Sequence, residues 1–245
     1  MTSSEKWAAP EEIQREQCIR ESENILSQPD ISYSEHEDLF RIEAVGLEWD
    51  IGAQIYEPSD PSQIAVGADG KKIGVYLLSG GDGDFKTMAP VAKVLCGKFG
   101  FKVTTMTYPG RLYLDDPSRH WPGDTINSDG TIRTPQWLAG EHITSDQYKV
   151  VKDISHRERY GTRTVLHAQP GSTFWYRMAG WPAAFERGGI EAMSRNMPED
   201  EYSIYVHGHS TGGPFVFMLS QRVPNVAGVM AIENSAFGYI NEAKL

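Results

Sequence analysis

The sequence has few cysteines and no long hydrophobic run. Cys18 and Cys96 are its only cysteines, and their number and separation fit neither a disulfide framework nor a metal-binding or C-x-x-C pattern. We therefore expect a reduced, cytoplasmic setting. No run of about 18 uncharged apolar residues occurs, and the first residues do not have the pattern of a signal peptide. We expect no membrane span and no export signal.

Basic side chains are also scarce. The chain of 245 residues has 33 acidic and 23 basic side chains, which gives a formal net charge of −10. Such a charge repels nucleic-acid phosphates and anionic lipid headgroups, so we do not expect nucleic acid as a partner. Hydrophobic residues make up 40% of the chain, which is enough for the core of a large globular domain.

Several runs of β-favouring residues predict the strands of one sheet. Residues 38–45 and 48–58 alternate in part between polar and apolar side chains on either side of Gly46, which predicts an antiparallel hairpin. Residues 73–78 form a nearly continuous apolar run, typical of a strand buried on both faces. Further strands are predicted at 101–107, 202–207 and 226–232.

Helical patterns separate these strands. Residues 214–222 predict one helix, and residues 88–99 predict another, which ends at Gly100. Alternating strands and helices imply right-handed crossovers and a parallel sheet. We therefore expect a mixed, mostly parallel α/β sheet with helices on both faces, over residues 38–245, preceded by a helical arm at 1–37. The apolar side of the helix at 88–99 is predicted to comprise Met88, Val91, Val94, Leu95 and Phe99.

A long segment interrupts this alternation. Residues 108–202 lie between two predicted strands, although a complete βαβ unit needs only about 30 residues. A crossover helix is predicted over 185–197, and a hairpin turn at 127–130. We interpret residues 108–184, between the fourth and fifth predicted strands, as an inserted loop or lid, because long insertions in compact domains are usually functional.

A glycine–serine motif joins the last two predicted strands through a helix. Residues 208–212 read Gly-His-Ser-Thr-Gly and match G-x-S-x-G, directly after a strand and directly before a helix. In such a turn the serine backbone is strained, and the two glycines allow strand and helix to approach closely. We expect Ser210 to project from the carboxyl edge of the sheet, where ligands bind in folds of this class.

A second glycine-rich segment, Ser79-Gly-Gly-Asp-Gly, follows an earlier strand. Together with the motif around Ser210, it gives the chain a resemblance to the α/β-hydrolase superfamily of esterases, lipases and amidases. The resemblance implies that Ser210 is the nucleophile of an ester, lactone or amide hydrolase that forms an acyl-enzyme and needs no cofactor. It also implies that the amides of Gly81 and Thr211, with Asp82 as an alternative, form the oxyanion hole. Many members have histidine where this chain has Ser79.

The other departure from the family concerns the base. Family members carry an acid and then a histidine after the serine, but none of the residues that follow Ser210 is histidine. His207 and His209 are poorly placed to act as the base and are expected to pack or to line the cleft. We expect a C-terminal segment, cleaved or present as a second polypeptide, to supply the base and the acid. Glu233 is an alternative acid at the end of the last predicted strand.

The sequence leaves the substrate open. Aromatic side chains line pockets well, so Trp121, Trp137 and Trp175, with His209, are candidates to line a cleft for an apolar or aromatic acyl substrate; packing in the core is an equal alternative for the tryptophans. A protein with this fold that does not hydrolyse its ligand, such as an acyltransferase, a perhydrolase or a binding module, is the alternative function. A homo-oligomer also remains open.

Two other kinds of site are disfavoured. Residues 80–87 approach the phosphate-binding pattern G-x-x-x-x-G-K-[ST], but Phe85 stands where the second glycine belongs, and Asp82 and Asp84 would repel a phosphate. The pair His207 and His209 is too small a set for a metal site. We therefore expect neither a nucleotide nor a metal ion.

Overall fold

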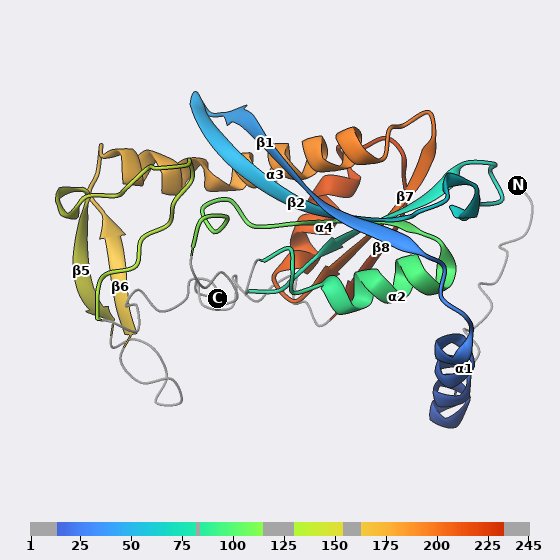
Figure 1. The fold of residues 1–245 in the computed structure, drawn as a ribbon. Helices are drawn as coiled ribbons and strands as arrows, with labels where there is room; N and C mark the ends of the chain where they lie inside the picture. Colours follow the sequence, from blue (N-terminus) through green and yellow to red (C-terminus); the bar gives the residue numbers. More distant parts are fainter. Residues whose placement is uncertain (1–13, 82–83, 115–129, 154–162, 233–245) are drawn as a thin grey trace, which may run out of the picture.

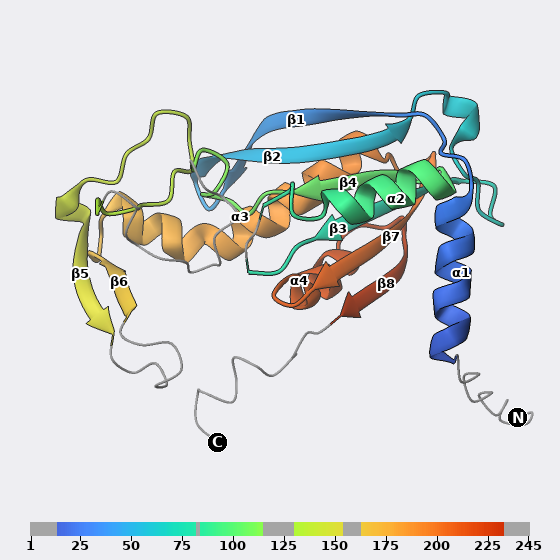
Figure 2. The same ribbon diagram turned by 60° about the horizontal axis from the view of Figure 1, so that its bottom comes forward.

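The structure, a computed structural model, describes residues 14–81, 84–114, 130–153 and 163–232. A six-stranded sheet of order β1-β2-β4-β3-β7-β8 forms its centre. The helix α2 covers one face of this sheet, whereas α3 and α4 lie on the other (Figures 1 and 2). The predicted class, a mixed and mostly parallel sheet between helices, is confirmed.

The sheet begins with a long antiparallel hairpin. Strand β1 (Tyr33–Ala44) pairs with β2 (Leu47–Pro58), and β2 also pairs antiparallel with β4. The hairpin was predicted, although β1 begins at Tyr33 rather than at Asp38. Its turn is strained, because Val45 has a φ of 50°, which is unfavourable for a β-branched residue. The Val45 side chain packs against Gly180 of α3, where a β-carbon would collide with it.

The parallel part of the sheet comprises β3 (Lys72–Leu78), β4 (Lys102–Met106), β7 (Tyr202–His209) and β8 (Val226–Ile232). Successive side chains of a strand point to opposite faces. On β3, Tyr76 and Leu78 join the larger core beneath α3 and α4, while Val75 and Leu77 join the smaller core beneath α2. Strand β3 is therefore buried on both faces, as its apolar sequence predicts, whereas the edge strand β8 is partly or largely exposed along its length.

Helix α2 (Ala89–Phe99) ends as predicted at Gly100, which has a φ of 68°. Its predicted apolar side was right for Met88 and Leu95, which pack in the smaller core, and wrong for the other three residues. The buried residues of the helix are Ala92, Cys96 and Gly97, and Met88 is buried at its N-cap; Met88, Ala92 and Cys96 are four residues apart and therefore on one face. Val91, Val94 and Phe99 are exposed. Small side chains let the helix backbone lie close to the sheet. Which side of the helix is buried therefore depends on the surface it packs against, and hydrophobic spacing within the helix does not reveal that surface.

The segment between β4 and β7 forms a small sheet and a long helix. Strands β5 (Tyr148–Asp153) and β6 (Arg163–Ala168) pair antiparallel, and helix α3 extends over Thr173–Asn196. The prediction that this helix begins at Phe185 was wrong. Pro182 lies inside the helix, although proline usually ends or kinks one. The hydroxyl of Ser172 caps the true N-terminus by accepting a hydrogen bond from the Trp175 amide. The predicted turn at 127–130 lies largely outside the described residues.

The remaining elements are short. Helix α1 (Arg15–Ser27) projects from the sheet and buries none of its residues (Figure 1). Lys98 of α2 holds its C-terminal end by donating to the Leu26 and Gln28 carbonyls. Among the described residues, no helix is both long and apolar enough to span a membrane. The other elements are two 3-10 turns and the helix after β7: η1 (Pro61–Gln63), η2 (Ser145–Gln147) and α4 (Gly212–Ser220).

A buried ion pair fastens α3 to the hairpin. Arg177 of α3 is 3% exposed and donates two hydrogen bonds to Glu141, at 3.3 and 2.9 Å, and a third to the Glu48 carbonyl. Its guanidinium also stacks 4.8 Å from the centre of the Trp49 ring. A guanidinium that makes three hydrogen bonds and has an aromatic neighbour is well satisfied, whereas its removal leaves the Glu141 carboxylate without its ionic partner.

A second carboxylate, Asp50 of β2, accepts hydrogen bonds from Arg41, from the Tyr113 hydroxyl and from the Ala139 amide, at 2.7 to 2.9 Å. Burial alone would raise the pKa of Asp50, but these three donors outweigh it and hold the pKa below its usual value. The chain that follows β4 is therefore fixed to β2 by charged groups as well as by apolar packing.

We predict that Arg177→Met lowers the free energy of unfolding by about 3 kcal/mol, because it leaves Glu141 unpaired in a partly buried position. The matched control is Arg222→Met, which removes the exposed 2.8 Å pair with Glu186 and should cost less than about 1 kcal/mol. Urea unfolding followed by far-UV circular dichroism measures both. Equal losses in the two variants would contradict this account of the anchor.

Candidate active site

Ser210 lies in a tight turn between β7 and α4. Its φ of 50° places a non-glycine residue in the left-handed region, a conformation that costs energy and occurs at functional turns. The Ser210 amide donates to the Ile232 carbonyl at 2.9 Å, and its carbonyl accepts from the Gly213 amide at 3.0 Å. The backbone of this serine is therefore fixed on both sides, at the carboxyl edge of the parallel strands.

The glycines on either side of Ser210 are required by close contacts. A β-carbon on Gly208 would collide with the backbone of Gly212, and one on Gly212 would lie 2.6 Å from the Ser79 carbonyl oxygen. These contacts are with backbone, which cannot move aside as a side chain can. The sequence prediction that both glycines let strand and helix approach closely is confirmed.

The glycine-rich loop after β3 lies directly beside this turn. A β-carbon on Gly80 would be 3.3 Å from the Ser210 β-carbon and 3.1 Å from His209 Nδ1. In the part of the chain that the structure describes, the amides of Gly81 and Thr211 donate no hydrogen bond. Thr211 is the N-cap of α4, whose first amides have no partner within the helix. The structure thus brings together the predicted serine, its following amide and the predicted loop.

Two residues in contact with this loop were missed by sequence reasoning. The Tyr108 hydroxyl donates to the Ser79 carbonyl at 2.8 Å, and Arg111 Nη1 donates to the Gly81 carbonyl at 3.3 Å. Both residues are buried. Their position just after the predicted strand at 101–107, on the same sheet edge as Ser210, is the only sequence signal that could have indicated them.

Neither neighbouring histidine pairs with Ser210. The Ser210 hydroxyl makes no hydrogen bond with any group in the described ranges. His207 lies on the α2 face of β7, and its buried Nδ1 has no hydrogen-bond partner among the residues that the structure describes. Burial lowers the pKa of His207, and the nearby His209 lowers it further. A neutral imidazole that faces the sheet surface agrees with the expectation that His207 is a packing residue.

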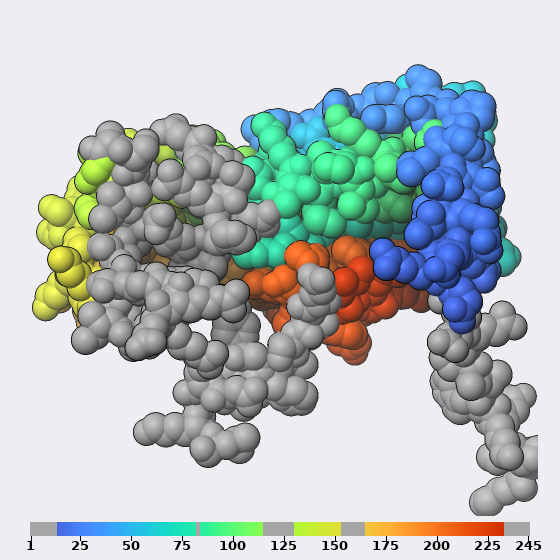
Figure 3. All heavy atoms as spheres, turned by 90° about the horizontal axis from the view of Figure 1, so that it is seen from below, coloured from blue at the N-terminus to red at the C-terminus, as the bar shows by residue number. Residues whose placement is uncertain are grey.

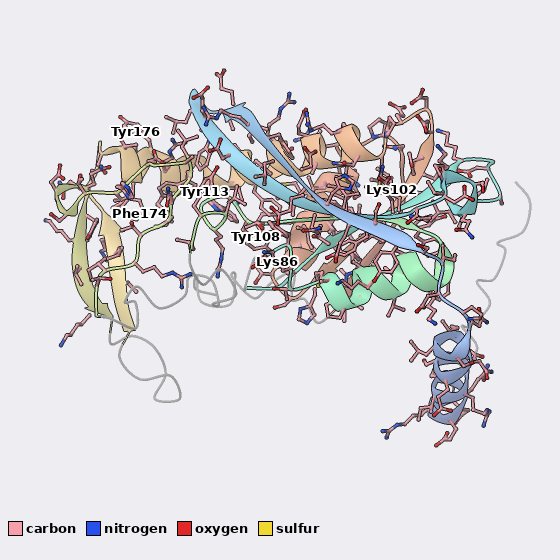
Figure 4. The ribbon with its side chains drawn as sticks, in the orientation of Figure 1. Lys86, Lys102, Tyr108, Tyr113, Phe174 and Tyr176 are labelled. Carbon is pink, nitrogen blue, oxygen red and sulfur yellow. The ribbon has the colours of Figure 1, made fainter. Side chains whose placement is uncertain are left out.

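The predicted aromatic residues lie in different places. Trp137 is fully buried and packs edge-on against Trp49, with ring centres 6.0 Å apart. Trp175 is 41% exposed, between two residues that Figure 4 shows beside the small β5–β6 sheet, at the opposite end of the molecule from α2. The structure therefore does not bring these two tryptophans together at Ser210. Asp82, Trp121 and Glu233 lie outside the described residues.

The two disfavoured kinds of site gain no support. The Phe85 amide, which a phosphate loop would need, instead donates to Thr107 Oγ1 at 3.1 Å, and its carbonyl accepts from Thr105 Oγ1 at 2.8 Å. Among the described residues, no group of three or more histidine, cysteine, aspartate or glutamate side chains could hold a metal ion.

An apolar groove, partly lined by His207, lies on the α2 face of the sheet, where α2 leaves part of that face uncovered. Figure 3 views this side, with α2 in green above β7 and β8 in orange to red. The groove has a volume of about 410 Å³, within the range of small-molecule pockets. It is lined by Val75, Leu77, Val91, Leu95, Tyr205, Val206, His207, Gly228, Val229 and Met230.

We predict that Gly212→Ala destabilises the protein by about 2 kcal/mol, because the added methyl group would displace the Ser79 carbonyl or α4. The matched control is Gly97→Ala in α2, where the new methyl group would meet two side chains and no backbone: the edge of the Tyr33 ring at 3.2 Å and Asp30 Oδ1 at 3.8 Å. There the better helix propensity of alanine, about 1 kcal/mol, offsets the crowding. Chemical denaturation measures both. A Gly212→Ala variant as stable as the parent protein would refute the close approach.

Comparisons with known proteins identify similarity only at the level of solved structures. No protein-family model matches the chain, and no curated protein sequence matches it. It is similar to a cold-adapted esterase from an Arctic intertidal metagenomic library, at 13% identity and a TM-score of 0.42, over 84% of this chain and 63% of that one. It is also similar to an S-formylglutathione hydrolase from Staphylococcus aureus, at 12% identity and a TM-score of 0.43, over 87% of this chain and 63% of that one.

A probable hydrolytic enzyme from Pseudomonas aeruginosa matches at 12% identity and a TM-score of 0.41, over 86% of this chain and 46% of that one. The chain spans less than two thirds of each of these structures. Its own strand order and strained serine between strand and helix show the fold independently of these matches. In its mixed sheet and its strand–serine–helix turn, the chain has the architecture of the α/β-hydrolase fold.

Proposed function

We propose that this chain carries the nucleophile and the oxyanion hole of a serine hydrolase that acts on ester-type bonds. The observation that supports this most directly is the backbone of Ser210, held at a φ of 50° against the loop at 79–81. A hydroxyl on such a turn projects toward the sheet edge instead of packing in the core. Ser210 is partly exposed, so a substrate can reach it.

In the proposed first step, the Ser210 Oγ attacks the substrate carbonyl carbon while a general base takes the hydroxyl proton. The carbonyl π electrons move onto oxygen and give a tetrahedral oxyanion. Collapse of this intermediate breaks the bond to the alcohol, which leaves with the proton and yields the acyl-enzyme. Water then repeats the sequence and releases the acid. No cofactor takes part.

The amides of Gly81 and Thr211 are the proposed oxyanion donors, with Asp82 as the alternative in the same loop. Neither the Gly81 nor the Thr211 amide is used elsewhere in the described structure, and Thr211 begins α4, whose N-terminal dipole favours negative charge nearby. Donors fixed before the reaction stabilise the developing charge without reorganisation, and each contributes about 10² to 10³ in rate.

The proposed reaction also needs a general base and an acid that orients it. Within the described ranges no group accepts the Ser210 proton. We propose that a histidine and its carboxylate come from a further segment, cleaved or carried by a second polypeptide; Glu233 is the alternative acid within this chain. The small-molecule acyl substrate would be apolar or aromatic, with Trp121 and His209 as proposed lining residues; the fully buried Trp137 and the exposed Trp175 are no longer proposed for this role.

The second candidate function is a binding module that keeps the fold without hydrolysis. The apolar groove beside His207, about 410 Å³ in volume, favours it, because a pocket of this size can hold an apolar ligand with no chemistry at Ser210. The two functions differ in whether Ser210 is an activated nucleophile, so one labelling experiment separates them.

We predict that a fluorophosphonate probe labels the complete protein covalently at Ser210, because only an activated serine reacts with it. Intact-mass spectrometry and peptide mapping would locate the adduct. Ser210→Ala should abolish labelling. The control Ser220→Ala should label like the parent protein, since that serine lies at the far end of α4. An unlabelled parent protein, or labelling that persists in Ser210→Ala, would favour the binding module and refute the hydrolase.

A further inference from the structure

The loop after β4 is hydrogen-bonded to the loop after β3 at two carbonyls, those of Ser79 and Gly81, with the Gly80 carbonyl between them. The Tyr108 hydroxyl donates to the Ser79 oxygen at 2.8 Å, and Arg111 Nη1 donates to the Gly81 oxygen at 3.3 Å. A trans peptide unit is planar, so a fixed carbonyl also fixes the orientation of its plane. The two anchored planes flank the single peptide unit that contains the Gly81 amide.

The Tyr108 side chain cannot turn away from this contact. Its ring is fully buried and packs edge-on against Phe185 and Trp181, with centres 5.0 and 5.9 Å apart. The Trp181 indole in turn donates to the Pro109 carbonyl at 2.9 Å. Helix α3 therefore holds both the ring and the backbone of the loop that presents the Tyr108 hydroxyl. Figure 4 shows Tyr108 in the interior, at the level of the sheet.

Arg111 is placed by a turn of its own backbone. Its amide donates to the Tyr108 carbonyl at 3.1 Å, and its carbonyl accepts from the Leu114 amide at 3.2 Å. Only 2% of the residue is exposed, so the hydrogen bond to Gly81 is screened little by solvent. A bond from a charged guanidinium is stronger than one between neutral groups.

The opposite side of the glycine loop rests on the serine turn. The Ser79 oxygen faces the α-carbon of Gly212, and the α-carbon of Gly80 faces Ser210. The loop at 79–81 is thus held between the β4 loop on one side and the nucleophile turn on the other. The orientation of its amides toward Ser210 is fixed only when the contacts with the β4 loop and with the nucleophile turn are both present.

We infer that Tyr108 and Arg111 are positioning residues that hold the oxyanion loop in its reactive orientation, an assignment that rests on the proposed hydrolase function. Neither is proposed to touch the substrate. Their effect would appear in the transition state, where the oxyanion forms, and not in binding of the uncharged ester. This distinguishes them from residues that only stabilise the fold.

The test is Tyr108→Phe in the complete protein, assayed with p-nitrophenyl acetate and with phenylboronic acid, which forms a tetrahedral adduct on a reactive serine. We expect kcat to fall about tenfold with KM unchanged, because the loss is confined to transition-state stabilisation. The inhibition constant of the boronic acid should rise by the same factor. Arg111→Lys, which keeps the charge but has a different shape, should lose less kcat than Arg111→Met.

Tyr113→Phe is the matched control, because it removes an equally short 2.8 Å hydrogen bond, to Asp50, from the same loop without touching residues 79–81. It should leave kcat unchanged. A parent protein without Ser210-dependent turnover would overturn the hydrolase itself. A parent protein with such turnover, and a Tyr108→Phe variant with the same kcat or with only a raised KM, would overturn the positioning role alone.

Discussion

The close approach of strand β7 to helix α4 is the constraint on which the rest of the site depends. Glycine at 208 and 212 removes the β-carbons that would separate the two backbones, and the chain between them is then too short to avoid a left-handed residue. That residue is Ser210. The energy of this strained turn is offset by the mostly buried strand β7 that precedes it and by the hydrogen bonds of the Ser210 backbone.

Charged groups far from Ser210 support the same geometry. The segment between β4 and β7 supplies Tyr108, Arg111 and the aromatic face of α3, and it is fixed to the hairpin through Arg177 and Asp50. Buried ion pairs contribute specificity of arrangement more reliably than net stability. In this chain the arrangement they specify places α3 against the ring of Tyr108, and hence against the loop beside the serine.

The sequence was most informative where local chemistry decides the structure. Local sequence is enough to predict the turn at Ser210, the hairpin and the parallel strands. The signals are the positions of glycine and the spacing of hydrophobic residues within each of these segments. The buried side of α2, the early start of α3 at Thr173 and the contacts of Tyr108 and Arg111 depend on partners distant in the chain. Pro182 shows this well: its local signal indicates a helix boundary, yet packing on both sides of it keeps the helix continuous.

The strained valine at the tip of the β1–β2 hairpin links the conformation of that turn to helix α3. The Val45 side chain lies against Gly180 of α3, and this contact offsets part of the energy of the positive φ. The contact exists only when α3 is formed and packed against the hairpin. The hairpin alone would therefore favour another turn conformation or a shifted register. The conformation of the turn between the first two strands is thus coupled to a helix more than a hundred residues away in the chain.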